Sequence, residues 1–517
     1  MSSSDLLKEC YQPFSLLQED VLKLKQNVIE QTEIEKAKLN LQEATESSLY
    51  SILNLINYVV MRRNELHPLQ SNLARAGISS LGRVEPHVMS NIDSVLNVLS
   101  ILNTCQPYEQ NNLYCVDYDG GYKQLRLRAE RLFGRPPKKR SEYIMVTMPS
   151  EVSDSVELVE SYLDAGMNCA RINCAHDDKK TWLKMIENIK KAADKNKQDC
   201  RILMDLAGHK IRTGHVYDLK AKKTKKAKIK EISGDTPRVF NGDFIVLSKG
   251  SVIENDILEN FEPSNVIAVT CTYPPIIDMV EVGQSVWIDD GKIGTVIKAK
   301  NNHAILLQVK QVGPKGVRLK EEKGLNFPET DMNLPTLSKK DCHDLKFVAK
   351  HADMVGLSFT EAADDVLFLR GMLEELGNAN LPILVKIETS KGVRNLPDIM
   401  LNALAKNMDL GVMIARGDLA VELGSVRMAE IQDEIIRLCE SAHIPVIWAT
   451  QVLESLAKQG AISRPEISDA AMSQRAECVM LNKGPYIAEA VKILSDVLQR
   501  MEGHQFKSHT HMRALHW

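Results

Sequence analysis

The stretch RILMDLA, Arg201–Ala207, decides the fold of this 517-residue chain. It is an apolar run of strand length that ends near an aspartate, and it continues as GHKIRTG to Gly214. Runs of this kind, most of them followed by an amphipathic segment, begin at Tyr143, Asn168, Arg201, Met354, Ile383, Gly411, Pro445 and Cys478. Near-continuous apolar strands that alternate with helices are typical of a parallel sheet covered on both faces. Eight such units predict an α/β fold, a (β/α)8 TIM barrel.

The gap between the third and fourth runs predicts an inserted domain. About 145 residues separate the two runs, far more than a helical connection needs. The gap contains β-rich segments with turn glycines, such as QSVWIDDGKIGTVIKAK (284–300). We therefore predict a small all-β domain at 215–329, between barrel parts at 141–214 and 330–505. Its basic run at 219–231 is interpreted as a solvated hairpin, with an anion-attracting edge as the alternative.

The first 140 residues predict an all-helical extension followed by a linker. Apolar residues recur there at helical spacing, as in Leu17, Val21, Leu24 and Val28. A helical bundle packed against another part of the structure is the favoured interpretation, and a partner-docking or regulatory module is the alternative. The Pro-rich basic stretch at 133–141 predicts a linker. Residues 506–517 are expected to form a C-terminal tail.

The composition is that of a soluble globular protein, with 44% hydrophobic and 26% charged residues and a net charge of −3. No global basic field argues for nucleic acid or for a membrane surface. The longest strongly apolar run, at 50–61, is shorter than the ~20 residues that a bilayer span needs. The ten cysteines lie singly, without a CxxC pair, and the N-terminus lacks a signal-peptide pattern. We expect a cytoplasmic protein with no nucleic-acid or membrane partner.

Polar residues end the predicted strands, at the face where barrels of this type form their active sites. These strand ends carry Arg171, Asn173, His176, Asp205, Ser358, Lys386, Glu388, Asp418 and Thr450. Alternation along the strand places Lys386 and Glu388 on one face. The carboxylates of Glu388 and Asp418 suit Mg²⁺, which takes waters and substrate oxygens as its other ligands. With Arg171 and Lys386 as phosphate-binding cations and the Thr450 hydroxyl, the set predicts phosphoryl transfer.

Long, ordered motifs in this chain resemble those of the pyruvate kinase family over about residues 142–500. They are CARINCAH, MDLAGHKIRTG, VWIDDGKIG, EEKGLNFPETDMNLPTLSKKD, LVKIETSKGVRN, VMIARGDLAVEL and PVIWATQVLESL. The family transfers a phosphoryl group from phosphoenolpyruvate to ADP with Mg²⁺, which is the last step of glycolysis. The resemblance implies this activity, the lid domain after the third strand, and phosphoenolpyruvate and ADP as small-molecule partners.

The resemblance also implies a role for each matching residue. As catalytic residues, Lys386 would neutralise the phosphoryl group in flight, Arg171 would grip it, and Thr450 would belong to the path that protonates the enolate. The substrate would be contacted by Arg171, Lys386, Gly417, Asp418, Thr450 and Ser358. The nucleotide would be contacted by Asn173, His176, Arg212, Lys323 and Asp290. Mg²⁺ would be held by Glu388 and Asp418.

The potassium site of the family is altered in this chain. A serine, Asn173, Asp205 and a threonine normally bind K⁺, and here Ala175 and Leu206 stand at the two hydroxyl positions. Members that work without K⁺ typically carry a lysine shortly after the aspartate, at the position of Lys210. Its ammonium can supply the charge that K⁺ would bring. The resemblance therefore implies a K⁺-independent enzyme, with a solvent-facing lysine as the alternative.

Other departures from the family keep further interpretations open. No effector-binding domain is expected after the barrel, the loop after the eighth run (479–491) is altered, and the first loop (146–154) is shortened. His209 stands where the family usually has proline, and no role is assigned to it. A catalytically weakened scaffold or regulatory protein is therefore the alternative function. An Mg²⁺-dependent aldolase or lyase is a third possibility, which the inserted β domain argues against. A homo-oligomer is plausible from the family.

Overall fold

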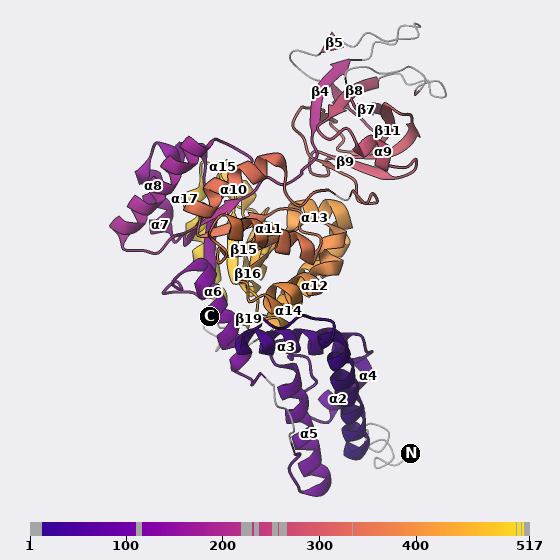
Figure 1. Ribbon diagram of the computed structural model, residues 1–517, viewed down its shortest axis with the longest axis vertical. Helices are drawn as coiled ribbons and strands as arrows, with labels where there is room; N and C mark the ends of the chain where they lie inside the picture. Colours follow the sequence, from indigo (N-terminus) through magenta and orange to yellow (C-terminus); the bar gives the residue numbers. More distant parts are fainter. Residues whose placement is uncertain are drawn as a thin grey trace.

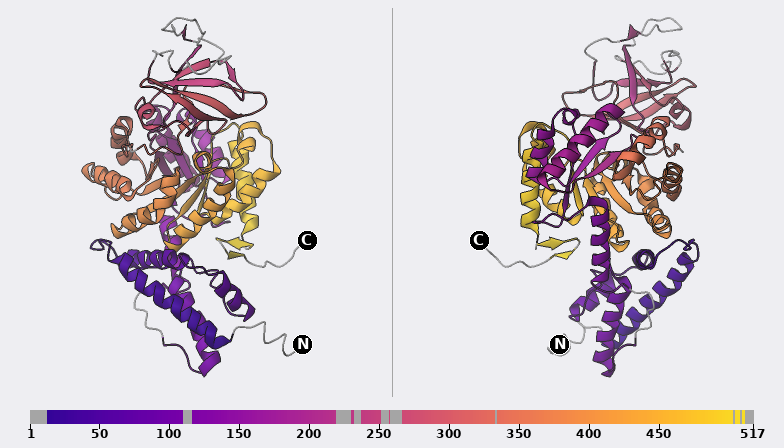
Figure 2. Two further views of the ribbon diagram at one scale, coloured as in Figure 1. Left: turned by 90° about the vertical axis from the view of Figure 1, so that its right-hand side faces the viewer. Right: turned by 60° about the vertical axis from the view of Figure 1, so that its left-hand side comes forward.

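The computed structural model describes residues 13–109, 116–218, 230–231, 237–250, 257, 266–332, 334–502, 504–507 and 509–510. Three parts follow one another along the longest axis: helices from the N-terminal region, a barrel, and a β domain at the opposite end (Figure 1). Two further views show the same order (Figure 2). The predicted fold class is confirmed. Of the hairpin predicted at 219–231, only Lys230 and Glu231 lie within the described residues.

Eight parallel strands close the barrel, and each comes from one of the eight apolar runs. In chain order they are β1 (Tyr143–Thr147), β2 (Cys169–Asn173), β3 (Arg201–Asp205), β14 (Met354–Leu357), β15 (Ile383–Ile387), β16 (Leu410–Ala415), β17 (Val446–Ala449) and β18 (Cys478–Leu481). The register sets Asp205 beside Asn173 on one side and Gly356 on the other. A Cβ at Gly356 would lie 2.5 Å from Asp205 Oδ1, so this strand position needs glycine.

Helices cover the outside of the barrel. They are α7 (Val156–Ala165), α8 (Lys179–Asn196), α10 (Lys339–His351), α11 (Ala363–Glu375), α12 (Ser390–Ala405), α13 (Arg416–Leu423), α14 (Ser425–Ser441), α15 (Glu454–Gln459), α16 (Arg464–Met472) and α17 (Ile487–Met501). Several begin with a capping side chain, which satisfies a free N–H of the first turn. Thr389 caps α12 by accepting from the N–H of Gly392 at 3.1 Å. The chain therefore turns directly after Glu388, which stays at the rim.

The barrel interior is filled from every strand, and one helix closes its base. Each strand contributes a buried side chain to one cluster, among them Met145, Cys169, Leu203, Met354, Leu384, Met413, Ile447 and Cys478. Leu132 and Phe133, at the end of α6 (Gly120–Phe133), belong to the same cluster. The following linker returns the chain to β1, where the Tyr143 hydroxyl donates to the carbonyl of Gly134 at 2.8 Å. Sequence analysis did not foresee that α6 would plug the barrel.

The remaining N-terminal helices are α2 (Phe14–Lys36), α3 (Glu46–Arg62), α4 (His67–Arg75) and α5 (Val88–Thr104). Leu17, Ile52 and Leu96 belong to one continuous hydrophobic core with Ile399 of α12 and Ile436 of α14. The helical region is therefore packed on the base of the barrel, a location that the sequence did not predict. No helix in the described part of the chain is long and apolar enough to cross a membrane.

The inserted domain is all-β and has its own core. Its eight-stranded sheet runs in the order β13-β9-β10-β11-β7-β8-β4-β5. The strands are β4 (Thr213–Asp218), β5 (Lys230–Glu231), β7 (Phe244–Ser248), β8 (Val266–Cys271), β9 (Ser285–Ile288), β10 (Ile293–Lys300), β11 (Ala304–Val312) and β13 (Leu325–Asn326). A two-stranded sheet, β6 (Arg238–Val239) with β12 (Val317–Arg318), and the short helix α9 (Ile276–Met279) complete it. We call residues 213–326 the lid.

Candidate active site

Three charged side chains meet at the carboxyl ends of β2, β3 and β15. Arg171 donates from Nε and Nη2 to Asp205 Oδ2, at 2.9 and 2.6 Å, and from Nη1 to the Thr147 hydroxyl at 3.0 Å. Lys386 Nζ lies 3.4 Å from the same Oδ2. Asp205 is 1% exposed, so its charge depends on these two cations for stabilisation. Sequence analysis predicted that these residues share the rim, and the structure brings them into contact.

Lys386 is held on a second side by Glu388 and Ser358. Its Nζ lies 3.2 Å from Glu388 Oε1 and donates to the Ser358 hydroxyl at 2.8 Å. Ser358 in turn donates to the carbonyl of Leu206, which ties β14 to β3. The other oxygen of Glu388 accepts from the N–H of Phe359 at 2.7 Å. The ammonium of Lys386 is therefore fixed in place by side chains from three strand ends.

The site stabilises its charges unequally. Burial opposes ionisation of Asp205, but Lys386 and Arg171 outweigh it and lower the pKa of that carboxyl. For Glu388 the balance is reversed, since burial and the Asp418 carboxylate raise its pKa against the pull of Lys386. Burial also disfavours the charge of Lys386, yet Asp205 and Glu388 raise its pKa. The charge of Glu388 is thus less well stabilised than that of Asp205, although Glu388 also pairs with Lys386.

Gly417, Asp418 and Thr450 lie at the adjoining ends of β16 and β17. The N–H of Gly417, in the first turn of α13, donates to Thr450 Oγ1 at 2.8 Å. Thr450 has φ +65°, a left-handed conformation that a β-branched residue seldom adopts. Arg416 is engaged elsewhere, because it donates to the carbonyls of Ala449 and Thr450 and pairs with Asp469. Arg416 therefore holds the two strand ends together.

Glu388 and Asp418 fit the magnesium prediction. The Asp418 charge is among the causes that raise the pKa of Glu388, so the two carboxylates repel each other. A divalent cation between them would relieve that repulsion. Among the described residues, no group of three or more His, Cys, Asp or Glu side chains is placed to hold a metal. Two carboxylates, with waters and substrate oxygens as the other ligands, suit Mg²⁺.

The residues predicted to contact nucleotide fall into two places. Asn173 and His176 line a cavity of about 240 Å³ beside Arg171, together with Lys458 and Lys483. Burial lowers the pKa of His176, and the nearby cation Lys483 lowers it further. The charge of Arg212, at the hinge of the lid, contributes to the same shift.

The other predicted nucleotide residues lie on the lid side. Arg212 donates from Nη1 to the carbonyl of Glu322 at 3.0 Å, and Lys323 Nζ lies 3.2 Å from Asp289 Oδ1. These contacts join Arg212 and Lys323 to the lid, while Asp290 is the residue that reaches the barrel side through Lys210.

Lys210 makes its ion pairs away from the altered potassium positions. Its Nζ lies 2.7 Å from Asp418 Oδ1 and 3.1 Å from Asp290 Oδ1. Asn173 Oδ1 instead accepts from the N–H of Ala175, and Asp205 is paired with Arg171 and Lys386. The charge of Asp205 is already neutralised by Arg171 and Lys386, so Lys210 pairs with Asp418 instead. Electrostatics therefore draws the ammonium to Asp418.

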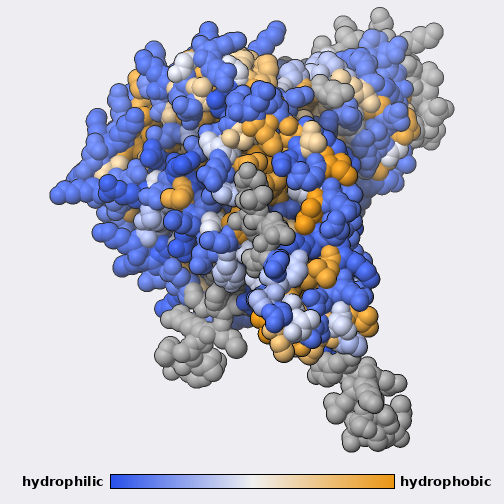
Figure 3. Space-filling model, turned by 60° about the horizontal axis from the view of Figure 1, so that its bottom comes forward, coloured by the Kyte–Doolittle hydropathy of each residue, from blue (hydrophilic) through white to orange (hydrophobic). Residues whose placement is uncertain are grey.

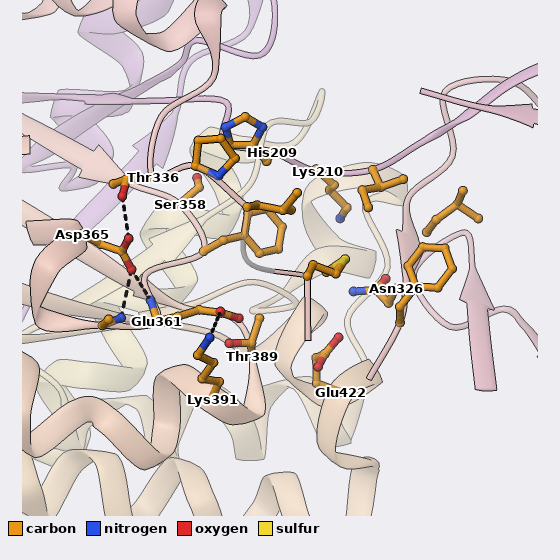
Figure 4. A pocket seen from close by; sticks show the side chains of 18 residues that line it. His209, Lys210, Asn326, Thr336, Ser358, Glu361, Asp365, Thr389, Lys391 and Glu422 are labelled. Atoms are coloured by element: carbon orange, nitrogen blue, oxygen red, sulfur yellow. Dashed lines mark hydrogen bonds and ion pairs between the residues drawn. The ribbon is translucent and has the colours of Figure 1, made fainter. Parts of the chain in front are cut away.

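A cavity of about 220 Å³ at the hinge of the lid was not predicted (Figure 4). His209, Asn326 and Glu422 line it, below the point where the chain enters and leaves the lid. Burial raises the pKa of Glu422 to about 7. The His209 Nε2 and Asn326 Oδ1 atoms are buried and have no hydrogen-bond partner within the described structure. His209, which had no role assigned from the sequence, thus forms part of the wall of the hinge cavity.

Fold and site together define a (β/α)8 protein with an inserted β domain and a cationic, carboxylate-bearing rim. The family model of the pyruvate kinase barrel domain matches residues 139–491. The pyruvate kinases of Bacillus licheniformis and Geobacillus stearothermophilus are each 33% identical to this chain, over 68% and 70% of its length. That of Chlamydia muridarum is 32% identical over 68%. The chain belongs to the pyruvate kinase family.

These relatives are longer than the matched region. The matches cover 55% of the Bacillus licheniformis protein, 57% of the Geobacillus stearothermophilus protein and 67% of the Chlamydia muridarum protein. The chain thus spans little more than half the length of the first two relatives. The similarity identifies the family through the barrel and its insert, and the N-terminal helices lie outside the matched residues.

Proposed function

We propose that this protein transfers the phosphoryl group of phosphoenolpyruvate to ADP, giving pyruvate and ATP. The convergence of Arg171, Lys386 and Glu388 around Asp205, in a chain of the pyruvate kinase family, carries the proposal. Phosphoryl transfer depends on positioning and on charge stabilisation more than on covalent chemistry. A buried set of cations and carboxylates, held together by ion pairs, supplies both positioning and charge stabilisation.

The cations would act on the phosphoryl group. Lys386 is immobilised by Ser358, Glu388 and Asp205, so its ammonium needs little reorganisation when charge develops on the phosphoryl oxygens. Arg171 keeps its guanidinium beside Lys386 by donating to Asp205 and Thr147, and would grip the phosphate. Ser358 contributes through the position of Lys386, and in this sense belongs to the substrate site.

The remaining substrate contacts would come from β16 and β17. The N–H of Gly417 and the hydroxyl of Thr450, now bonded to each other, would turn to the substrate carboxylate. Thr450 would also serve the path that delivers a proton to the enolate. Glu388 and Asp418 would hold Mg²⁺, which when bound neutralises charge on the substrate oxygens.

Nucleotide would bind between the barrel rim and the lid. Asn173 and His176 line the cavity next to Arg171, and Arg212, Lys323 and Asp290 lie on the lid and its hinge. Closure of the lid would bring the two groups together around the phosphates and exclude water, which otherwise competes as phosphoryl acceptor.

The proposed enzyme does not require K⁺ and works in the reducing cytoplasm as part of glycolysis. Ala175 and Leu206 have no side-chain oxygen for a monovalent cation, and Lys210 and Lys386 already bring two ammonium groups to the site. Asp205 Oδ1 is buried without a hydrogen-bond partner in the described structure, so it is the oxygen at which a K⁺ effect would arise. The eight cysteines that the structure describes are unpaired, which fits a reducing compartment.

One assay tests the proposal: pyruvate formation from phosphoenolpyruvate and ADP with Mg²⁺, with and without K⁺. We expect turnover at similar rates in both salts. No turnover in either salt contradicts the kinase function and favours the scaffold or regulatory alternative. Strong activation by K⁺ contradicts the K⁺-independence but leaves the kinase function intact.

Replacing Lys386 separates chemistry from metal binding. Lys386→Met should lower kcat by about a thousandfold or more, because a preorganised charge at the transferring group is lost. Mn²⁺ binding at Glu388 and Asp418, followed by electron paramagnetic resonance as a stand-in for Mg²⁺, should persist. Lys391→Met is the matched control, since Lys391 follows the same strand but pairs with Asp331 and Glu361 outside the cluster. Retained turnover in Lys386→Met would refute the role of this lysine.

A further inference from the structure

We infer that Lys210 is a latch between the barrel and the lid which Mg²⁺ must displace. Its ammonium holds Asp418 of the barrel and Asp290 of the lid at the same time. In this state the lid is clamped to the rim, and the carboxylate proposed as a metal ligand is occupied by a lysine. The inference rests on the proposed function in one respect, namely that Asp418 is a ligand of Mg²⁺.

The three latch residues come from three separate elements. Lys210 follows β3 in the segment that enters the lid, Asp418 lies in the first turn of α13, and Asp290 lies in the turn between β9 and β10. Figure 4 shows the Lys210 side chain reaching over the hinge cavity, away from His209 beside it. The Lys210 side chain is 18% exposed and that of Asp418 20%, so solvent screens this pair only in part. The Lys210–Asp418 pair is therefore shielded, whereas the side chain of Asp290, on the lid, is 61% exposed.

The lid is shaped around the stem of Lys210. A Cβ at Gly324 would lie 2.6 Å from Lys210 Cε and 3.3 Å from its Nζ. Gly324 needs no left-handed backbone conformation, so the close approach of the lysine explains the absence of a side chain. Asp290 itself has φ +53°, which directs the β9–β10 turn toward the ammonium. Lys210 thus packs closely against Gly324, and most of its side chain is shielded from solvent.

Mg²⁺ and the ammonium would compete for the same carboxylate. The Asp418 Oδ1 atom accepts from Lys210, and a metal bound to Asp418 would lie within a few ångströms of that nitrogen, where two positive charges repel strongly. Lys386 does not offer an alternative partner to Asp418, because its Nζ is taken up by Asp205, Glu388 and Ser358. Metal binding should therefore push Lys210 off Asp418 and leave it attached to the lid through Asp290 alone.

The first test measures metal affinity without substrate. In titrations of the full chain with Mn²⁺ and Mg²⁺, Lys210→Met should bind about tenfold more tightly than wild type, because the competing cation is gone. Lys292→Met is the matched control: it removes the same charge from a lysine near the same lid turn, but Lys292 pairs with Asp289. The control should bind within about twofold of wild type, as expected for an exposed pair. Unchanged affinity in Lys210→Met overturns the competition.

The second test measures how firmly the lid is attached to the barrel. At the base of the lid, the Leu325 amide donates to the carbonyl of Ile211, the Thr213 amide donates to the carbonyl of Lys323, and the Lys323 amide donates to the Thr213 hydroxyl. The hydrogen exchange of these amides therefore reports on the attachment of the lid. Mg²⁺ should speed their exchange in wild type, and Asp290→Asn should speed it without metal while leaving metal affinity within about threefold. Exchange that responds to neither change refutes the latch.

A third variant separates this inference from the function on which it rests. Glu388→Gln should weaken Mn²⁺ binding while leaving the amide exchange of the metal-free lid unchanged, because Glu388 does not contact Lys210. If Glu388→Gln and Asp418→Asn both bind metal like wild type, the metal site of the proposed function is wrong and the competition fails with it. If Glu388→Gln and Asp418→Asn bind metal more weakly but Lys210→Met does not bind it more tightly, the metal site is supported and only the latch is wrong.

Discussion

The lid covers one end of the barrel and the N-terminal helices cover the other, but only the helices share the barrel's core. Ile288, Ile305 and the other buried residues of the lid form a separate cluster. Leu17, Ile52 and Leu96 of the N-terminal helices belong to the cluster that also contains the helix layer of the barrel. The lid meets the rim through the charges of Lys210, Asp290 and Asp418 and through a hydrogen bond between Asn326 and Glu422.

This difference indicates which end can move. A unit with its own core can shift as a body when a few polar contacts change, whereas a shared apolar core must stay assembled. At the base, Asn54 donates to the carbonyls of Glu85 and Ser441, and Arg128 donates to those of Ala442 and His443. We therefore expect motion at the lid and a rigid joint at the base.

The largest effect is expected from a cavity in the lid core. Ile305 is fully buried in β11, so Ile305→Ala should lower the stability of the lid by about 4 kcal/mol. Hydrogen exchange should accelerate across the lid strands and stay unchanged in the barrel strands. If barrel amides accelerate to the same degree, the two cores are not independent and the comparison fails.

A somewhat smaller effect is expected at the base, and it should spread through the molecule. Asn54→Ala leaves the carbonyls of Glu85 and Ser441 and the N–H of Val88 without this partner, which should cost about 3 kcal/mol. Thermal unfolding should show helices and barrel melting together at a lower temperature. Asn64→Ala, which removes contacts only within α3, is the control. A separate early transition of the helices would show that the joint is weaker than the shared core implies.

The smallest effect concerns a buried charge at the base. Both carboxylate oxygens of Glu440 are buried without hydrogen-bond partners in the described structure, and burial raises its pKa to about 8 although Lys507 opposes this. The native state therefore keeps a proton that the unfolded chain loses from about pH 4.5 upward, so stability falls as pH rises through this window. Glu440→Gln should be nearly as stable as wild type at about pH 5 and should become more stable than wild type as pH rises toward about 8.

Urea unfolding at these two pH values measures the difference between Glu440→Gln and wild type. Glu434→Gln is the control, because Glu434 lies on the same helix but pairs with Arg62 at the surface. A gain for Glu440→Gln that is independent of pH would contradict the unpaired-charge explanation. The comparison is with Asp205 at the rim, whose charge is neutralised by Arg171 and Lys386. The test therefore shows whether a buried carboxylate is stabilised at the rim but not at the base.

Much of the fold followed from local patterns in the sequence. Each of the eight apolar runs became a barrel strand, and alternation along β15 placed Lys386 and Glu388 on one face, 3.2 Å apart. The β character of the insert and the helical character of the N-terminal region depend on the same short-range periodicity. Such features depend on patterns within about ten or twenty residues, so they can be predicted from the sequence alone.

The features that the sequence did not predict depend on contacts between distant residues. Lys210 pairs with Asp418, 208 residues further along, and the choice follows from which carboxylates other cations have already neutralised. Likewise, the closure of the barrel base by Phe133 and the cavity beside His209 arise only when separate elements meet. The periodicity of apolar residues in the sequence does not indicate which distant charges pair or where a cavity forms.

The shared core at the base also affects how the chain emerges from the ribosome. Asn54 and the Ser441 carbonyl that it binds are 387 residues apart. At about 5–20 residues per second, synthesis of that interval takes roughly 20–80 seconds. During this time the apolar surfaces of α2, α3 and α5 lack α12 and α14, and some hydrophobic residues remain visible at this end even in the finished molecule (Figure 3). Nascent chains should therefore engage chaperones early, and deleting α12 to α14 should trap them there.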